Sequence, residues 1–227
     1  MLRVDWCQYK AAKYAVENWH YSKSMPMPPL VMVGAWEDSK YIGCVLFARG
    51  ANKSLGEPWG LTQTECAELV RVALTKHTAP VSQIVARAVK FLQKHDPAVR
   101  ALISYADPSE GHHGGIYQAM GWVYTGTSAP SEKVFFRGDW VHKRTVTAGA
   151  FGQGTAVAGV ASLPRKKTPG KHRYALALDA ATREVFAVRA KPYPKRPAKG
   201  SSVSTTDREG GSIPTTGLQS MPAEASG

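Results

Sequence analysis

Residues 66–126 alternate strand-like and helix-like patterns, and this alternation restricts the chain to a mixed α/β fold. The strand pattern CAELVRVAL (66–74) precedes the clearest helix of the sequence, in which apolar residues recur at helical spacing from Val81 to Leu92, with Thr78 as the expected N-cap. ALISY (101–105) is then a short buried strand that ends just before Asp107. Because such elements pack in layers around a shared core, we expect one sheet flanked by helices.

Further elements extend this pattern towards both ends of the chain. We expect a helix at 9–19, an antiparallel hairpin at 30–36 and 41–47, a short helix at 115–120, and strands at 122–126, 133–137, 172–178 and 184–190. From about Pro192 onward the chain is rich in Pro, Gly, Ser and Thr and has no apolar period. The sequence therefore predicts one ordered α/β domain over 1–190, which includes a basic β extension from about residue 133, and a disordered tail over 191–227.

The formal net charge of +12 is concentrated in one part of the chain. Residues 133–199 hold 15 basic and 3 acidic residues, whereas residues 1–132 hold 13 and 11. A localised basic stretch with interspersed aromatic residues attracts a phosphate backbone, so we predict binding of nucleic acid. A solvated basic face that only favours solubility is the alternative. The predicted contacts are Arg165, Lys166, Lys167, Lys171, His172 and Arg173.

Other features exclude several classes of protein. The three cysteines, Cys7, Cys44 and Cys66, are far apart and form no C-x-x-C motif, which argues against a disulfide framework or a thiolate zinc site. No apolar run reaches the roughly 20 residues that a membrane-spanning helix needs. The first ten residues contain no secretory signal, so we expect a cytoplasmic protein.

Four segments carry a resemblance to known proteins. IYQAMGW (116–122) resembles the I/L-Y-x-x-x-G-F/W signature in the last helix of the GNAT superfamily of acyltransferases. More specifically, WHYSKSMP (19–26), LVRVAL (69–74), residues 104–126 and GKHRY (170–174) resemble the phage Mom proteins. The resemblance covers roughly residues 9–189. It implies a GNAT-like fold and an enzyme that converts adenine in duplex DNA to N6-carbamoylmethyl-adenine, which protects the DNA from restriction.

Four residues are our candidates for the catalytic centre. Asp107 follows a strand at its carboxyl end, where open α/β sheets bind ligands, although it could instead only cap the next turn. Tyr117 occupies a position at which GNAT enzymes often carry a general acid, although it could instead only pack against Trp122. By resemblance, Asp107 accepts a hydrogen bond or proton from adenine N6, Tyr117 donates one, Ser82 holds the donor carbonyl, and His20 lies at the rim.

The predicted substrate-binding residues come from three segments. Trp19 to Lys23 combine aromatic, imidazole, hydroxyl and cationic groups, which suits the wall of a base pocket. Arg71, on the strand 66–74, is expected to bind an anionic group or to brace Asp107. The full predicted set is Arg71, Tyr21, Ser22, Lys23 and Tyr105.

The cofactor is left open by the residues. In ordinary GNAT enzymes the turn before the long helix presents several backbone N–H groups to the pyrophosphate of coenzyme A. Here that turn, 76–82, has no glycine and loses one N–H at Pro80, so we expect weak binding of coenzyme A. The donor is acetyl-CoA or another small molecule such as a glycine-like compound. Iron is a further alternative, with His20, Asp107, His112 and His113 as weak candidate ligands.

Two other functions compete with DNA modification. A plain N-acetyltransferase acting on a protein or a small amine would explain Tyr117 but not the basic segment. A nucleic-acid-binding protein without catalytic activity would explain the basic segment but not the polar residues His20, Asp107 and Tyr117.

Overall fold

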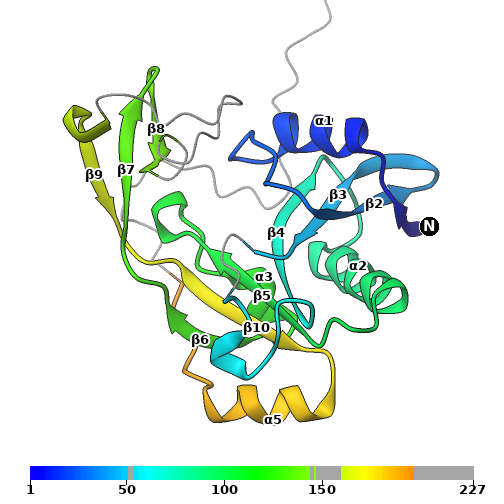
Figure 1. The fold of residues 1–227 in the computed structure, drawn as a ribbon. Coiled ribbons are helices and arrows are strands. Elements are labelled where there is room, and N and C mark those ends of the chain that lie inside the picture. The colour runs from blue at the N-terminus through cyan, green and yellow to red at the C-terminus, as the bar shows by residue number, and fades with distance from the viewer. Residues whose placement is uncertain (51–53, 144–145, 147–159, 197–227) are drawn as a thin grey trace, which may run out of the picture.

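The computed structural model describes residues 1–50, 54–143, 146 and 160–196. Figure 1 shows the arrangement of its elements. In chain order they are β1 (Leu2–Trp6), α1 (Tyr9–Trp19), β2 (Leu30–Glu37), β3 (Lys40–Ala48), η1 (Glu57–Trp59), β4 (Cys66–Leu74), α2 (Val81–His95), β5 (Ala101–Ala106), η2 (Pro108–Glu110), α3 (Gly115–Ala119), β6 (Val123–Thr127), β7 (Ser131–Phe136), β8 (Asp139–His142), η3 (Val160–Ser162), β9 (Arg165–Thr168), β10 (His172–Ala177) and α5 (Ala180–Val188).

Seven strands form one mixed sheet in the order β1-β2-β3-β4-β5-β10-β6. The β4–β5 pair is parallel, and the other neighbouring pairs are antiparallel. Residues 81–95 form the crossover helix α2 between the two parallel strands, which is the connection that such a pair requires. The predicted mixed sheet flanked by helices is therefore confirmed.

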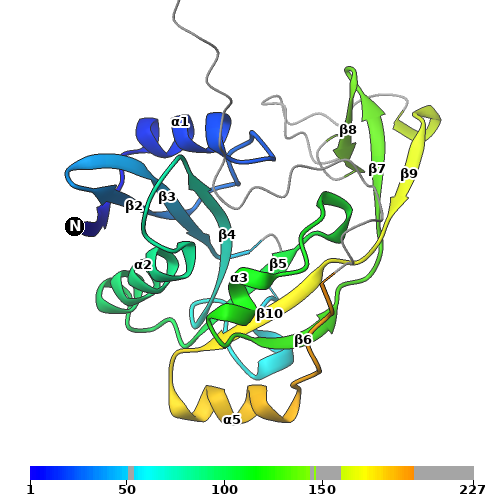
Figure 2. The ribbon, with the colours of Figure 1, turned by 180° about the vertical axis from the view of Figure 1, so that it is seen from behind.

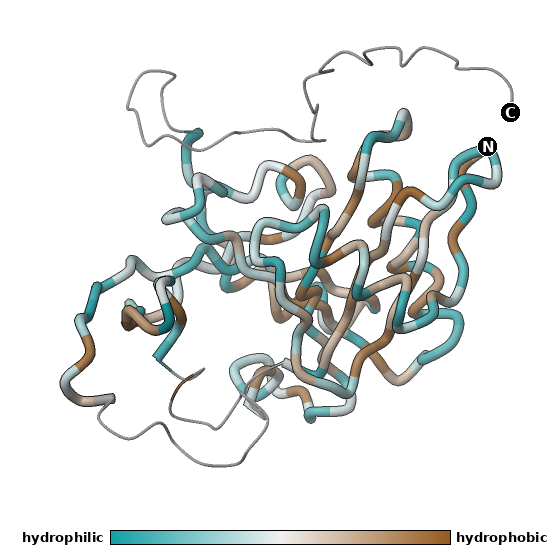
Figure 3. The backbone as a smooth tube through the Cα atoms, turned by 90° about the horizontal axis from the view of Figure 1, so that it is seen from above, coloured by the Kyte–Doolittle hydropathy of each residue, from teal (hydrophilic) through white to brown (hydrophobic). Residues whose placement is uncertain are grey.

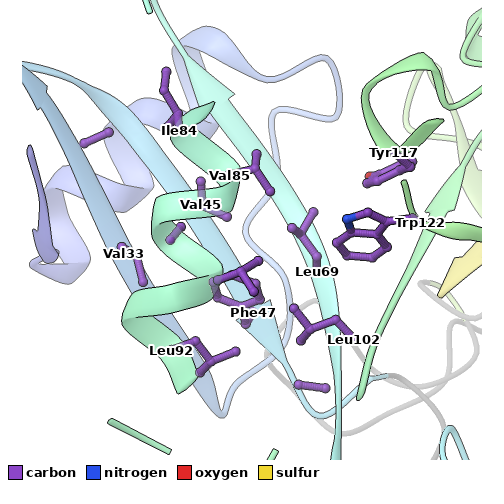
Figure 4. Packing of buried hydrophobic residues seen from close by; sticks show 14 of the residues in the cluster. Val33, Val45, Phe47, Leu69, Ile84, Val85, Leu92, Leu102, Tyr117 and Trp122 are labelled. Carbon is purple, nitrogen blue, oxygen red and sulfur yellow. The ribbon is translucent and has the colours of Figure 1, made fainter. Parts of the chain in front are cut away.

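Helices cover both faces of this sheet (Figure 2). The apolar side of α2 packs with Tyr117 of α3 and with Trp122 against one face, and Figure 4 shows this packing. On the opposite face α1 covers one part of the sheet through Ala12, Ala15 and Val16, and α5 covers another through Phe186. Figure 3 shows hydrophobic stretches of the chain alternating with hydrophilic ones through the body of the fold.

The segment 184–190, predicted as a strand, instead forms the second half of helix α5 up to Val188 and the two residues that follow it. The Asp179 carboxylate caps this helix by accepting a hydrogen bond from the Thr182 N–H at 2.8 Å. Thr182 and Phe186, four residues apart, are the buried positions of the helix. The prediction was wrong because a short apolar run fits a strand as well as a helix, and the cap decides between them.

Two smaller expectations also need correction. Thr78 does not cap α2: the helix begins at Val81, and the Thr78 N–H instead donates to the Glu37 carboxylate. Strand β1 was not predicted from the sequence and pairs with β2 over its whole length.

The predicted basic β extension forms a separate three-stranded sheet in the order β8-β7-β9. Its β7–β8 hairpin turns at Arg137 and Gly138, which have φ values of +52° and +87°. A two-residue turn with both φ values positive matches the right-handed twist of the paired strands. The chain then returns to the main sheet through β10, which lies between β5 and β6.

The predicted boundary at residue 190 falls inside a packed segment. The Lys191 N–H donates to the Tyr124 carbonyl at 2.8 Å, and the Tyr193 hydroxyl donates to the Trp122 carbonyl at 2.9 Å. Residues 191–196, which the sequence assigned to the tail, therefore lie against the domain, whereas residues 197–227 lie outside the described residues. None of the helices in the described part of the chain is long and apolar enough to cross a membrane.

Candidate functional site

The site lies where the parallel pairing of β4 and β5 ends. The two strands pair only from Cys66–Ala101 to Glu68–Ile103, although β4 runs on to Leu74 and β5 to Ala106. A register shift in the β3–β4 ladder between Leu69 and Arg71 marks a bulge at this point. The Ser104 hydroxyl oxygen lies 2.8 Å from the Leu69 carbonyl oxygen and 2.7 Å from the Tyr117 hydroxyl. One side chain thus links both strands to helix α3.

Asp107 follows β5 directly, as predicted, and its carboxylate has three fixed partners. One oxygen accepts hydrogen bonds from the Ser109 N–H at 3.0 Å and the Ser109 hydroxyl at 2.6 Å. The other lies 3.0 Å from the Lys171 ammonium group. Burial alone would raise the pKa of Asp107, but the Ser109 hydrogen bonds and the Lys171 charge outweigh it and lower the pKa. Asp107 therefore caps a turn and also presents a buried, ionised carboxylate at the strand end.

Tyr21 brings the predicted loop to the same place. Its ring is half exposed and contacts two imidazoles at a tilt, with centroid distances of 4.3 Å to His20 and 5.1 Å to His112. The charges of Arg71 and Asp107 both act on its hydroxyl group. The structure thus joins residues about 90 positions apart in the chain into one aromatic wall.

His20 is neutral at physiological pH. Burial, together with the charges of Arg71 and His112, lowers its pKa to about 3. Its Nδ1 accepts a hydrogen bond from the Ser22 N–H at 3.1 Å and lies 2.8 Å from the Ser22 hydroxyl. A neutral imidazole that accepts at Nδ1 carries its hydrogen on Nε2, so His20 can donate a hydrogen bond from that atom.

Arg71 braces the loop rather than Asp107. Its guanidinium donates to the Val70 carbonyl at 2.7 Å and to the Ser24 carbonyl at 3.4 Å, so it ties the segment after His20 to strand β4. Burial lowers the pKa of Arg71, although a guanidinium stays charged at any physiological pH. Lys171, which we predicted as a contact to nucleic acid, is the residue that braces Asp107.

Tyr117 is buried, and burial raises its pKa to about 12. Its ring lies beside that of Trp122, with centroids 5.1 Å apart, as Figure 4 shows. The ring packs in the core against Trp122, and the hydroxyl faces Ser104 at the end of the β4–β5 pairing, while the role of Tyr117 as a general acid stays a prediction. The phenol stays protonated at neutral pH and can act as a donor.

Ser82 and Tyr105 lie apart from these groups. Ser82 is in the first turn of α2 and lines a groove of about 580 Å³ between α2, α3 and β10, with Gln83, Lys90, Met120 and Arg183. Trp122 lines the same groove, and its buried indole N–H has no hydrogen-bond partner among the described residues. Tyr105 packs in the cluster on the opposite face of the sheet from Tyr117 and pairs in register with Arg173.

The four weak metal candidates do not assemble. His112 contacts the Tyr21 ring, whereas His113 lies beside Gly115. Burial and the charge of His113 lower the pKa of His172. Within the described ranges no three His, Cys, Asp or Glu side chains are close enough to hold a metal ion. Asp107 is engaged by Lys171 and Ser109, and His20 by Ser22. These residues do not fit an iron site, and we derive no step through one.

The predicted nucleic-acid contacts divide into two groups. Lys166 and Lys167, on β9, are exposed and form no ion pair among the described residues, while Arg165 pairs with Glu132 at 3.3 Å. The remaining three residues have partners in the domain: Lys171 binds Asp107, His172 lies 3.2 Å from the Tyr124 hydroxyl, and Arg173 donates to Thr125. Of the six predicted contacts, the exposed ones are therefore on strand β9 of the small sheet.

Sequence analysis did not identify Glu37, which ends β2. Its carboxylate accepts hydrogen bonds from the N–H groups of Thr78 at 2.8 Å and Ala79 at 2.5 Å, immediately before α2. These two hydrogen bonds lower the pKa of Glu37. A carboxylate thus occupies backbone donors of the turn that we expected to hold an anion poorly.

The model of the Mom protein family matches residues 1–195. The chain belongs to the Mom family. No curated protein sequence matches this Mom protein significantly.

Solved structures with a similar fold are acetyltransferases and related synthases of low sequence identity. A Bacillus subtilis acetyltransferase in complex with CoA is 13% identical, has a TM-score of 0.47, and aligns over 79% of the Mom chain and 100% of its own. An aminoglycoside acetyltransferase in complex with coenzyme A and kanamycin is 10% identical, with a TM-score of 0.48 and coverages of 83% and 98%. An N-acyl amino acid synthase from uncultured soil microbes is 11% identical, with a TM-score of 0.44 and coverages of 78% and 90%. The strand order by itself confirms the predicted single mixed sheet flanked by helices.

The first prediction concerns coenzyme A. The Glu37 carboxylate occupies the N–H groups of Thr78 and Ala79 and is negatively charged, like the pyrophosphate of coenzyme A. We therefore expect coenzyme A to bind weakly and Glu37→Ala to tighten that binding. Isothermal titration calorimetry with coenzyme A measures this. Glu17→Ala, which removes an exposed carboxylate from α1, should change nothing. Tight binding by the wild type, or no gain in Glu37→Ala, would show that Glu37 does not control this turn.

The second prediction concerns the Asp107–Lys171 pair. The pKa of Asp107 is lowered in the folded protein, so the pair stabilises the fold above the ordinary aspartate range, and this contribution is lost as pH falls through the folded pKa. We expect Lys171→Met to lower the free energy of unfolding at neutral pH and to have little effect at strongly acidic pH. Urea unfolding across a pH series measures this. Lys166→Met is the control, and a pH-independent loss in Lys171→Met would contradict the pairing.

Proposed function

We propose that this Mom protein transfers a carbamoylmethyl group to N6 of adenine in duplex DNA, and so protects DNA from restriction, in the cytoplasm of a host cell. The family match over residues 1–195 supports the activity. The observation that carries the proposal is the juxtaposition of Asp107, Tyr21 and His20 beside Arg71 at the end of the β4–β5 pairing.

The half-exposed ring of Tyr21, with His20 and His112 beside it, suits a base that has left the DNA double helix. Adenine N6 is paired inside a duplex, so the enzyme must extrude the nucleotide and hold it against aromatic side chains. Tyr21 offers the exposed part of its ring, and His20 Nε2 offers a donor for a ring nitrogen of the base. Lys23 and Ser22 complete the loop around this position.

Asp107 would orient N6 from the other side. In the reaction the bond from N6 to the methylene carbon forms as the bond from that carbon to the donor's leaving group breaks. The leaving group departs with the electron pair, and N6 loses one proton to it or to solvent. The Asp107 carboxylate is ionised at neutral pH and accepts a hydrogen bond from N6. Its low pKa suits an acceptor that positions the amine more than a base that retains the proton, while Lys171 fixes its direction.

The donor molecule would come from the side of α2 and α3. The groove beside Ser82 is lined by apolar residues and by the cations Lys90 and Arg183, which together suit a small molecule with a carbonyl or carboxylate group. The Tyr117 hydroxyl would donate a hydrogen bond to the donor or its leaving group, since its phenol stays protonated. A plain acetyltransferase is less well supported, because Glu37 occupies backbone donors near the groove.

The third prediction tests the centre. Asp107→Asn and Tyr117→Phe keep side-chain volume nearly constant, so each should reduce adenine modification by about 100-fold or more while the fold and DNA binding persist. Mass spectrometry of nucleosides from cells that express each variant measures the product. Tyr105→Phe, on the other face of the sheet, is the matched control. Wild-type product levels in Asp107→Asn or Tyr117→Phe would refute the role of that residue, and absence of modified adenine with the wild-type protein would refute the function.

The fourth prediction concerns the partner. Binding of duplex DNA should weaken steeply as salt rises, and Lys166→Gln with Lys167→Gln should lower the slope of log affinity against log salt by about 0.9 for each lysine that contacts a phosphate. Fluorescence anisotropy across a salt series measures this slope. Lys10→Gln with Lys40→Gln removes two exposed lysines elsewhere and should leave it unchanged. An unchanged slope in the β9 variant would place the phosphate contacts on another surface.

A further inference from the structure

The β7–β8 hairpin exposes two large aromatic side chains that face each other across the strands. Phe135 and Trp140 are directly paired in register, and their rings meet edge to face with centroids 5.5 Å apart. They are 40% and 37% exposed, which is high for such rings in a sheet. A cross-strand aromatic pair stabilises a hairpin by itself, so the pair needs further evidence before it indicates a partner.

That evidence comes from how charge is divided between the faces of the small sheet. The strand alternation and the register place Lys133 and Lys166 on the same face as Phe135 and Trp140. Both acidic residues of the hairpin, Glu132 and Asp139, belong to the opposite face. There Glu132 is neutralised by Arg165 at 3.3 Å and Lys143 at 3.7 Å. The aromatic face thus carries cations without the hairpin's acids.

The aromatic face is also connected to the candidate centre. Lys133, two residues before Phe135, pairs with Glu110 of η2 at 3.1 Å, and its charge acts on Tyr21. Strand β9 leads within a few residues to Lys171, which binds Asp107. Two residues of strand span roughly 7 Å, so Phe135 follows Lys133 along β7 by about that distance.

We propose that the β7–β8 hairpin inserts Phe135 and Trp140 into the base stack of duplex DNA, next to the adenine that leaves it. This inference rests on the proposed function and adds the element that opens the duplex. Residues 131–143 and 165–173 together hold eight lysines and arginines against two acidic residues, which favours a polyanionic partner over a protein or a neutral membrane.

Insertion of the two rings forms and breaks no covalent bond. Apolar wedges unstack a base step and bend the duplex, and the contact between aromatic rings and the exposed base faces offsets the lost stacking. Lys166 would hold a phosphate beside the opened step, while Lys133 remains paired with Glu110 and keeps the hairpin close to the centre. The displaced adenine then reaches Tyr21 and Asp107.

The test uses the full-length protein and short duplexes that carry a single 2-aminopurine in every combination of flanking bases. The fluorescence of 2-aminopurine rises when the base leaves the stack. With wild-type protein we expect an increase, and with Phe135→Leu plus Trp140→Leu we expect that increase to disappear and affinity for the paired duplex to fall at least about tenfold. Phe135→Tyr plus Trp140→Tyr keeps the rings and should restore both.

Controls separate this inference from the proposed function. Phe136→Leu removes an aromatic side chain from the opposite face of the same hairpin and should behave as wild type. If wild-type protein shows no salt-dependent DNA binding, the proposed function fails and this inference with it. If it binds and raises the fluorescence but the double leucine variant does the same, only the inserted hairpin is wrong. Should that variant not fold, as judged by circular dichroism, the single variant Trp140→Leu decides by the same readout.

Discussion

The early end of the β4–β5 pairing is the constraint on which the site depends. Two parallel strands that stay paired leave no room between them, but here the backbone ladder stops after three residue pairs. Ser104 then takes over with its side chain, which bonds to the Leu69 carbonyl and to the Tyr117 hydroxyl. The bulge after Leu69 redirects β4, so that Arg71 can reach the Ser24 carbonyl and hold the loop of His20 and Tyr21 at the opening.

Charge at this opening is arranged in fixed pairs. Asp107 is ionised because Lys171 and Ser109 outweigh its burial, and Glu110 is paired with Lys133. Both cations come from the segment between β6 and the end of β10, which also supplies the exposed basic residues of the small sheet. The same segment can therefore hold the carboxylate of the centre and attract a phosphate backbone, and the proposed hairpin insertion uses this connection.

Glu37 changes which ligands the turn before α2 can bind. A helix N-terminus with free N–H groups attracts anions, but a carboxylate from the neighbouring strand β2 already fills those of Thr78 and Ala79. The groove between α2 and α3 remains, with the cations Lys90 and Arg183 in its lining. In the proposed reaction this arrangement favours a small donor without a pyrophosphate.

The sequence by itself determined the alternation of strands and helices, the position of Asp107 at a strand end and the concentration of positive charge, because these follow from apolar period, turn residues and local composition. It did not decide between helix and strand at 184–190, because a short apolar run fits both periods. The Asp179 cap that begins the helix was visible only in the structure. Only the tertiary structure decided which partner each charge takes. Lys171 with Asp107, Lys133 with Glu110, and Glu37 with the turn before α2 are contacts between segments distant in the chain, and no spacing within one segment encodes them.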